Sequence, residues 1–140
     1  MIYFKEHYVT VQYDECHNLV EVEWHGMVIS NYFRETLEMV LDLINEHQVE
    51  NFLVNRQFMH RISLADEQWR KEDWYPRFLE SSIKRSASVI SKDHYTEVSI
   101  SRLIEETDKE IKIERRSFYD YEEAKKWLLK SKPVPNKKGY

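Results

Sequence analysis

The sequence predicts a single α/β domain with a mostly parallel five-stranded sheet, an antiparallel hairpin at one edge and four helices, in the order ββαβαβαβα. Two segments near the amino terminus alternate apolar and polar residues, which is typical of half-buried strands. Later apolar runs alternate with segments of helical period, which favours parallel βαβ units. A length of 140 residues, with 41% hydrophobic and 33% charged side chains, suits one globular domain.

The opening hairpin is predicted from residues 8–14 (YVTVQYD) and 19–26 (LVEVEWHG). Each strand places its apolar residues on one face, and the polar segment DECHN between them reads as a turn. One face of each strand is therefore expected in the core. These core-facing residues are Val9, Val11 and Tyr13 in the first strand, and Val20, Val22 and Trp24 in the second.

A helix over residues 30–48 and a short strand over 51–55 (NFLVN) are expected next. Ser30 is suited to cap the helix, and the mostly apolar strand is typical of a segment covered on both faces. The stripe that should bury this helix consists of Phe33, Leu37, Val40, Leu41 and Ile44.

Three more helices alternate with two more strands in the remainder of the chain. Ser63 is the predicted N-cap of the second helix, with Asp66 three residues on. The closing helix has Asp120 and Glu123 at the same spacing. We expect a domain over residues 1–131 and a flexible basic tail over 132–140. The remaining elements are a helix through 81, a strand at 85–91, a helix at 93–107, a strand at 111–118 and a helix at 120–130.

The helix after Ser63 is unusually rich in aromatic residues, and Pro76 should kink it because proline has no N–H to donate to the carbonyl of Glu72. Trp74 and Phe78 fall outside the expected core stripe. Either the kink turns both side chains inward, or they form a surface for an apolar ligand or a symmetric dimer. The expected core stripe consists of Ala65, Trp69, Tyr75, Leu79 and Ile83.

The chain resembles the SpoIIAA-like group of STAS domains, particularly small stand-alone bacterial versions grouped with CRAL–TRIO lipid-binding folds. Four segments carry the resemblance, and they span nearly the whole chain. The resemblance implies a layered βα fold and a non-catalytic interaction or sensing module. The segments are NLVEVEWHG, NFLVNRQ, SLADEQWRKEDWYPRFLESSIKRSASVISKD and FYDYEEAKKWL.

Two departures from this resemblance affect the expected site. Anti-anti-sigma proteins of this group are switched at a serine that begins a helix, and Ser63 stands at a comparable place without the surrounding motif. Relatives often carry Asp-x-Arg after the third strand, whereas this chain has Asn55 followed by Arg56. The carboxylate is lost there, which weakens acid–base or metal chemistry in that segment.

The segment after the predicted strand at 51–55 is the expected binding site, because ligands of open α/β sheets lie beyond the carboxyl ends of strands. Its side chains offer hydrogen-bond donors for a carboxylate or phosphate. The alternative is a loop that is polar because it faces water. The expected site residues are Asn55, Arg56, Gln57, His60, Arg61 and Ser63, with Trp74 and Phe78 as apolar contacts.

Catalytic and metal chemistry have weaker signals. The six histidines lack metal-ligand spacing, and the single cysteine, Cys16, lies in the predicted hairpin turn. Glu21, Glu23 and His25 share one strand face, but it is the face patterned for solvent. Glycine-rich phosphate loops are absent from the sequence. We therefore expect neither an enzyme nor a metal or other cofactor.

The charge distribution bears on the partners that we expect. Net charge is −4, and residues 109–140 carry ten basic and five acidic groups, so the body of the chain is acidic. We expect no nucleic-acid binding, which needs a clustered basic face, and no membrane-spanning segment. The leading hypothesis is a cytoplasmic regulatory or protein-interaction module, which could bind itself. The alternative is a carrier of a small apolar or amphipathic ligand, which requires an apolar pocket of roughly 300 Å³ or more.

Overall fold

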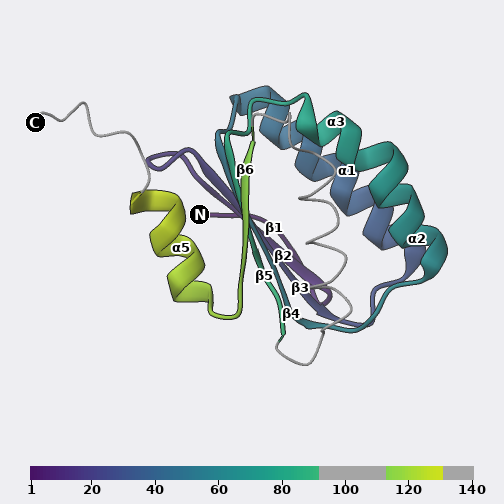
Figure 1. Ribbon diagram of the computed structural model, residues 1–140. Coiled ribbons are helices and arrows are strands. Elements are labelled where there is room, and N and C mark those ends of the chain that lie inside the picture. The colour runs from purple at the N-terminus through teal and green to yellow at the C-terminus, as the bar shows by residue number, and fades with distance from the viewer. Residues whose placement is uncertain (92–112, 131–140) are drawn as a thin grey trace, which may run out of the picture.

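The computed structural model describes residues 1–91 and 113–130, and within them the chain forms a six-stranded sheet with helices on both faces (Figure 1). The strands lie in the sheet in the order of the sequence, from β1 to β6. Strands β1 to β3 pair antiparallel, and β3 to β6 pair parallel. The strands are β1 (Ile2–Glu6), β2 (Val9–Asp14), β3 (Leu19–Gly26), β4 (Asn51–Met59), β5 (Arg85–Val89) and β6 (Glu114–Phe118).

The mixed sheet and the opening hairpin agree with the prediction, but β1 is an additional edge strand. It pairs only with β2, and most of its side chains are exposed. An edge strand with little burial carries no alternating pattern, which is why the sequence did not reveal it. The predicted helix at 93–107 lies outside the described residues. The helical elements that the structure describes are α1 (Ser30–His47), α2 (Leu64–Trp69), the π-helical turn η1 (Arg70–Trp74), α3 (Tyr75–Leu79) and α5 (Tyr121–Lys130).

Two layers of side chains bury the two faces of the sheet. Helix α1 and the α2–η1–α3 segment cover one face, and α5 covers the other (Figure 1). The larger cluster includes the predicted core residues of both hairpin strands except Tyr13, which is partly buried and packs against it. The smaller cluster under α5 contains Leu19, Leu53, Ala87, Val89, Ala124 and Leu128.

Helix α1 buries the predicted stripe, but it begins differently from the prediction. Its N-cap is Ile29, which makes no side-chain capping bond. Ser30 is the first helical residue instead, and its hydroxyl donates to the Asp66 carboxylate at 2.7 Å. The serine therefore joins α1 to α2 rather than capping its own helix. The stripe is buried at Phe33, Leu37, Val40, Leu41 and Ile44.

The α2–η1–α3 segment buries a different face from the one that an ideal helix predicts. Ala65 is exposed and Trp69 is half-buried, whereas Trp74 and Phe78 are buried. The cause is the π-helical turn, in which the amide of Tyr75 bonds to the carbonyl five residues earlier. One additional residue in a turn rotates the following side chains by about 100°. The expected stripe is therefore wrong at the exposed Ala65 and in leaving out Trp74 and Phe78. Trp69, Tyr75 and Leu79 are half-buried, and Ile83 is buried as predicted.

Pro76 explains the position of this turn. It stands in the first turn of α3, where its missing N–H leaves no hydrogen bond to the carbonyl of Glu72. The neighbouring hydrogen bonds change to the wider π spacing immediately before it. Of the two alternatives that the sequence left open, the structure has the kink that turns Trp74 and Phe78 inward.

Trp74 should therefore stabilise the fold more than Trp69. Trp74→Ala is expected to lower the free energy of unfolding by about 3–5 kcal/mol, because it opens a cavity among packed aromatic rings. It also leaves the Leu37 carbonyl without the indole N–H that it accepts at 2.7 Å. The half-buried Trp69→Ala should cost clearly less. Urea unfolding of both variants gives the comparison, and an equal or larger loss for Trp69→Ala would contradict the observed helical phase.

Candidate functional site

Strand β4 is longer than predicted, and this divides the expected binding loop between two faces of the sheet. The sequence predicts a strand that ends at residue 55, whereas β4 continues to Met59 because its parallel pairing with β3 extends to Gly26. Arg56 lies on the helix-covered side, and Asn55 and Gln57 lie on the α5 side. The prediction that these residues emerge together from one loop is therefore wrong.

A bulge in β4 contributes to this division. The pairing with β3 passes from Asn55 directly to Phe58, so two residues of β4, Arg56 and Gln57, lie opposite the single residue Trp24, and one residue is inserted. The side-chain oxygen of Asn55 accepts the amide of Gln57 at 3.0 Å, which holds the irregular backbone. Bulges redirect side chains near binding sites. Here Gln57 and Phe58, which are consecutive, line the same groove on the α5 side.

On the helix-covered side, a pocket of about 410 Å³ lies between the sheet and the α2–η1–α3 segment. Its walls are aromatic rings that hold one another in place. Trp74 stacks on Phe78 with ring centres 5.1 Å apart, and Phe78 meets Phe52 edge-on at the same distance. Trp74 is also fixed by its hydrogen bond to α1. The wall residues are Trp24, Phe33, Phe52, Trp74, Tyr75 and Phe78.

Basic side chains line the same pocket. Arg56 comes from β4, and His60 and Arg61 come from the loop that follows. Arg70, on η1, bonds to Glu67 at 2.9 Å, while its buried Nε has no hydrogen-bond partner in the described part of the chain. The structure thus brings three predicted residues, Arg56, His60 and Arg61, together with an arginine that the sequence did not single out.

Trp74 and Phe78 are buried in the structure, which corrects the hypothesis that they form an exposed dimer contact. Their exposed fractions are 4% and 1%. Side chains buried in this way cannot present a patch to a second copy, so a dimer contact through them is wrong. Both residues remain part of the predicted site as walls of the pocket. The homodimer itself stays an untested prediction.

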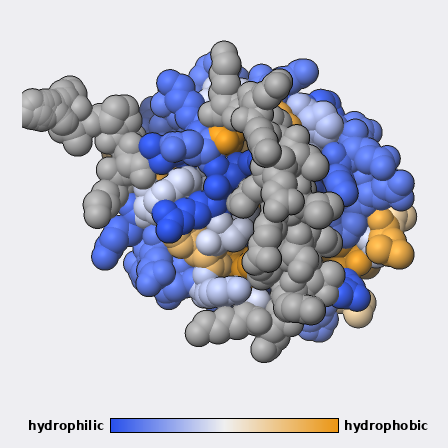
Figure 2. Space-filling model, in the orientation of Figure 1, coloured by the Kyte–Doolittle hydropathy of each residue, from blue (hydrophilic) through white to orange (hydrophobic). Residues whose placement is uncertain are grey.

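Three exposed apolar side chains lie at the carboxyl ends of β3 and β4, and we call them the apolar rim: Met27, Ile29 and Leu64. Their exposed fractions are 75%, 62% and 87%. The two loops that carry them are joined by a backbone hydrogen bond from His60 to Gly26 at 2.9 Å. Figure 2 shows hydrophobic side chains at the surface on the right of the molecule, where Figure 1 places α2.

Ser63 and Asp66 connect the rim to the body of the fold. As predicted, Ser63 caps α2, and its hydroxyl accepts the amide of Asp66 at 3.1 Å. The buried Asp66 carboxylate accepts bonds from Ser30 at 2.7 Å and from Arg34 at 2.9 Å. Burial alone would raise the pKa of Asp66, but these hydrogen bonds outweigh it, so the pKa lies below its ordinary value. Asp66 therefore ties the starts of α1 and α2 together.

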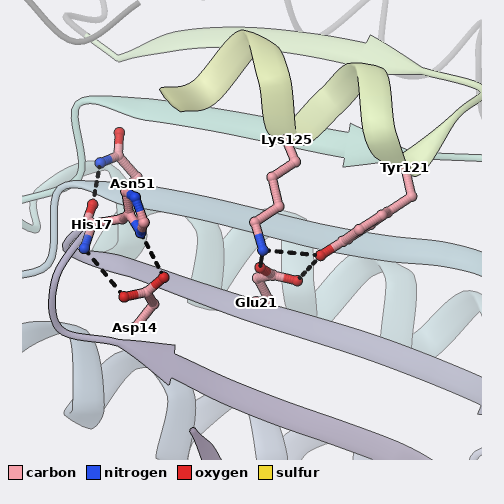
Figure 3. Close-up of polar contacts among 6 residues, drawn as sticks. All are labelled: Asp14, His17, Glu21, Asn51, Tyr121 and Lys125. Atoms are coloured by element: carbon pink, nitrogen blue, oxygen red, sulfur yellow. Dashed lines mark hydrogen bonds and ion pairs between the residues drawn. The ribbon is translucent and has the colours of Figure 1, made fainter. Parts of the chain in front are cut away.

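On the α5 side, Glu21 is bound by two residues of α5 (Figure 3). Its carboxylate accepts the Tyr121 hydroxyl at 2.7 Å and pairs with the Lys125 ammonium at 2.7 Å. Burial, with Glu21 adding to it, raises the pKa of Tyr121 to about 12. Glu21 thus holds α5 on the sheet. The neighbouring pair of Glu23 and His25 is partly exposed and 3.3 Å apart.

The turn between β2 and β3 contains Cys16 and the adjacent His17, for which the sequence predicts no metal binding. His17 bonds to Asp14 through its ring nitrogen at 2.7 Å, and its carbonyl accepts Asn51 at 3.0 Å (Figure 3). The hydrogen bond from His17 lowers the pKa of Asp14. These contacts fasten the turn to the start of β4. Over residues 1–91 and 113–130 no three His, Cys, Asp or Glu side chains are grouped as metal ligands.

Several residues of the pocket and rim had only weak signals in the sequence. Ser86 and Ser88 line the pocket floor from β5, and their alternation in RSASV places polar groups where the helix-covered face is otherwise apolar. An apolar residue directly after a helix cap, as Leu64 is after Ser63, is another available signal. The rim residues Met27 and Ile29 had none, because isolated apolar residues in loops are common.

Comparison with known proteins places the fold. No family model matches the chain, and no curated protein matches its sequence. An uncharacterised protein of the DUF3478 family with a SpoIIAA-like fold, from Shewanella loihica, matches with a TM-score of 0.64 and 12% identity over 89% of this chain and 97% of its own. A chain of the complex of the diguanylate cyclase SiaD with its activator SiaC, from Pseudomonas aeruginosa, matches with a TM-score of 0.52 and 7% identity over 84% and 98%.

At these identities the two likenesses show the fold alone, and the chain has a SpoIIAA-like fold as the resemblance predicted. The CRAL–TRIO part of that resemblance gains no support from them. Among the helices that the structure describes, none is long and apolar enough to cross a bilayer.

The Asp66 contacts make a testable contribution to stability. Asp66→Asn should lower the free energy of unfolding at neutral pH by about 1–3 kcal/mol, because the hydrogen bonds to Ser30 and Arg34 lose their charged acceptor. A carboxylate whose pKa is lowered in the folded state stabilises above its unfolded value, here near 3.8, and this stabilisation disappears as the pH falls through the folded pKa.

The measurement is urea unfolding between pH 7 and pH 2.5. The difference between wild type and Asp66→Asn should be largest at neutral pH and shrink below about pH 4. The matched control is Asp42→Asn, which removes an exposed carboxylate from α1. A wild-type–variant difference for Asp66 that stays constant over this range would contradict the assigned role.

Proposed function

We propose that this protein is a non-catalytic regulatory module that binds a protein partner through the apolar rim and the adjoining mouth of the pocket. The observation that carries the proposal is the exposure of Met27, Ile29 and Leu64 at one edge of the sheet. Large apolar side chains grouped at the surface mark interaction sites in soluble proteins. This edge is also where open α/β sheets bind their ligands.

The position of the rim strengthens this interpretation. The Asp66 hydrogen bonds hold the loop before α1 and the start of α2 in a fixed relation. Rigid presentation reduces the entropy that a surface loses when it binds. Arg61 and His60 flank the rim and supply polar contacts at its border. An apolar centre with a polar border is the usual anatomy of a protein interface.

The likeness to SiaC supports the same class of function by analogy of fold. SiaC is the activator of the diguanylate cyclase SiaD and is seen in complex with it. A fold shared at 7% identity carries no partner from one chain to the other. The partner of this chain is therefore defined only by the chemistry of the rim. A cytoplasmic location remains a prediction from the sequence.

The arrangement of acidic and basic groups favours binding over catalysis. The carboxylate of Glu21 is bound to Tyr121 and Lys125, and these contacts attach a helix. Glu23 and His25 are exposed to solvent to a similar degree, and Glu23 lines an open groove. A general acid and base need environments that move their pKa values apart. A structural role explains these contacts fully.

A second candidate is a carrier or sensor of a small apolar or amphipathic ligand. The sequence required an apolar pocket of roughly 300 Å³ or more for this function. The pocket beside η1 has a volume of about 410 Å³ and aromatic walls. The two candidates are compatible, because the rim lies at the edge of the pocket and Leu64 belongs to both.

Site-specific cross-linking in the cells that express the protein tests the leading proposal. Leu64→p-benzoylphenylalanine places a photoreactive group on the rim, and illumination is expected to give a discrete cross-linked species that denaturing gels resolve. Cross-linking should fall severalfold when Met27→Ser and Ile29→Ser are added, because the apolar contact area is lost.

The matched control is Glu122→p-benzoylphenylalanine, which places the same group on the exposed side of α5, on the opposite face. It should not give the species obtained from position 64. The proposal is contradicted if position 64 yields no cross-link, or if both positions yield the same products.

A further inference from the structure

The pocket beside η1 has the features of a ligand-binding site and is not a gap left by loose packing. Two of its wall residues, Trp24 and Phe78, are almost fully buried, yet they line a space of about 410 Å³. The hydrogen bond from Trp74 to Leu37 and the stacking of Trp74 on Phe78 keep the rings from closing it. Preformed apolar pockets with a few convergent polar groups are typical small-molecule sites.

The polar groups of the pocket are predominantly cationic. Arg56, Arg61 and Arg70 line it, and Glu67 is its single acidic lining residue within the described part of the chain. Glu67 pairs with Arg70, so the one carboxylate among these described lining residues is already bound to an arginine of the same lining. The buried Nε of Arg70 still has no hydrogen-bond partner among the described residues. Such a group is stabilised by an anionic acceptor.

The volume restricts the size of the ligand. At about 30 Å³ per water molecule, the pocket has the volume of roughly a dozen waters. That space holds one ring system or one short chain, and it is too small for a two-chain phospholipid. The hydroxyls of Ser86 and Ser88 on the pocket floor add a place for one hydrogen bond to the body of the ligand.

We propose that this pocket binds a compact amphipathic monoanion. Its aromatic or short-chain body lies among Trp24, Phe52 and Phe78, and its carboxylate, sulfonate or phosphate lies against Arg61 and Arg70. This assignment rests on the second candidate of the proposed function and gives its ligand a chemical class. Partner binding at the apolar rim does not depend on it.

Two fluorescent dyes of similar shape test separately whether the pocket binds the anionic group of a ligand and whether it binds the apolar body. 1-Anilinonaphthalene-8-sulfonate carries a sulfonate, and N-phenyl-1-naphthylamine has the same rings without it. With the full-length chain, both dyes should bind with a stoichiometry of about one. Arg61→Gln and Arg70→Gln together should weaken the sulfonate dye about tenfold and change the neutral dye less than about twofold, since one charge-assisted contact is worth about that much.

Three control variants make the outcome specific to the pocket. Ser88→Phe fills the floor and should abolish binding of both dyes. Met27→Ser alters the rim outside the pocket, and Lys71→Gln removes an exposed charge from η1, so both should leave the two affinities unchanged. Far-ultraviolet circular dichroism establishes that each variant is folded. If Ser88→Phe does not fold, displacement of the sulfonate dye by decanoate, but not by decanol, replaces it.

Three results would overturn the proposal. Neither dye binds, or the arginine variants bind the sulfonate dye as tightly as the wild type, or they lose both dyes equally. If any of these occurs while cross-linking from position 64 persists, the small-ligand site is rejected and the protein-interaction module stands. If the dyes behave as expected while cross-linking fails, the pocket is retained and the partner proposal falls.

Discussion

The spacing of the helical hydrogen bonds immediately before Pro76 determines which side chains of the α2–η1–α3 segment pack on the sheet. Proline cannot donate to the preceding turn, and the chain widens into a π-helical turn in front of it. That single change rotates Trp74 and Phe78 onto the sheet. With a regular helix throughout, Trp69 and Tyr75 would occupy the core. The aromatic walls contributed by Trp74 and Phe78 follow from this rotation, and Arg70, which belongs to the same turn, lines the pocket with them.

The Asp66 carboxylate is a second feature that holds this helical layer in place. It is buried at the junction of α1 and α2, where it accepts hydrogen bonds from Ser30 and Arg34 of α1, while the Asp66 amide donates to the cap residue Ser63 of α2. Arg34 also lies over the ring of Trp69, so that the ion pair and the half-buried tryptophan support each other. The rim is therefore carried by ordered loops, and its exposed apolar side chains are not a result of fraying.

The sheet separates two environments that are close together in the sequence. The helix-covered side has the pocket, whereas the α5 side has a smaller groove of about 230 Å³, lined in part by Glu23, Asn55 and Phe58. Residues 55 to 58 contribute to both environments. Asn55 faces the groove and Arg56 faces the pocket, and because of the bulge in β4 the consecutive residues Gln57 and Phe58 both face the groove. The proposed binding at the rim and the attachment of α5 through Glu21 thus involve different sides of the same sheet.

The sequence by itself determined the α/β class, the opening hairpin, the buried stripe of α1 and the caps at Ser63 and Asp120, because alternation and capping depend on neighbouring residues. It also singled out Arg56, His60 and Arg61 as expected site residues, and the folded chain brings these three to one pocket. Only the tertiary structure decided that β1 pairs at the edge, that β4 extends to Met59 and that Trp74 and Phe78 are buried. Each of these depends on a partner distant in the sequence or on a turn that changes helical phase. Local periodicity shows neither long-range pairing nor a change of helical phase. The pocket between α2, η1 and the sheet could therefore be identified only from the tertiary structure.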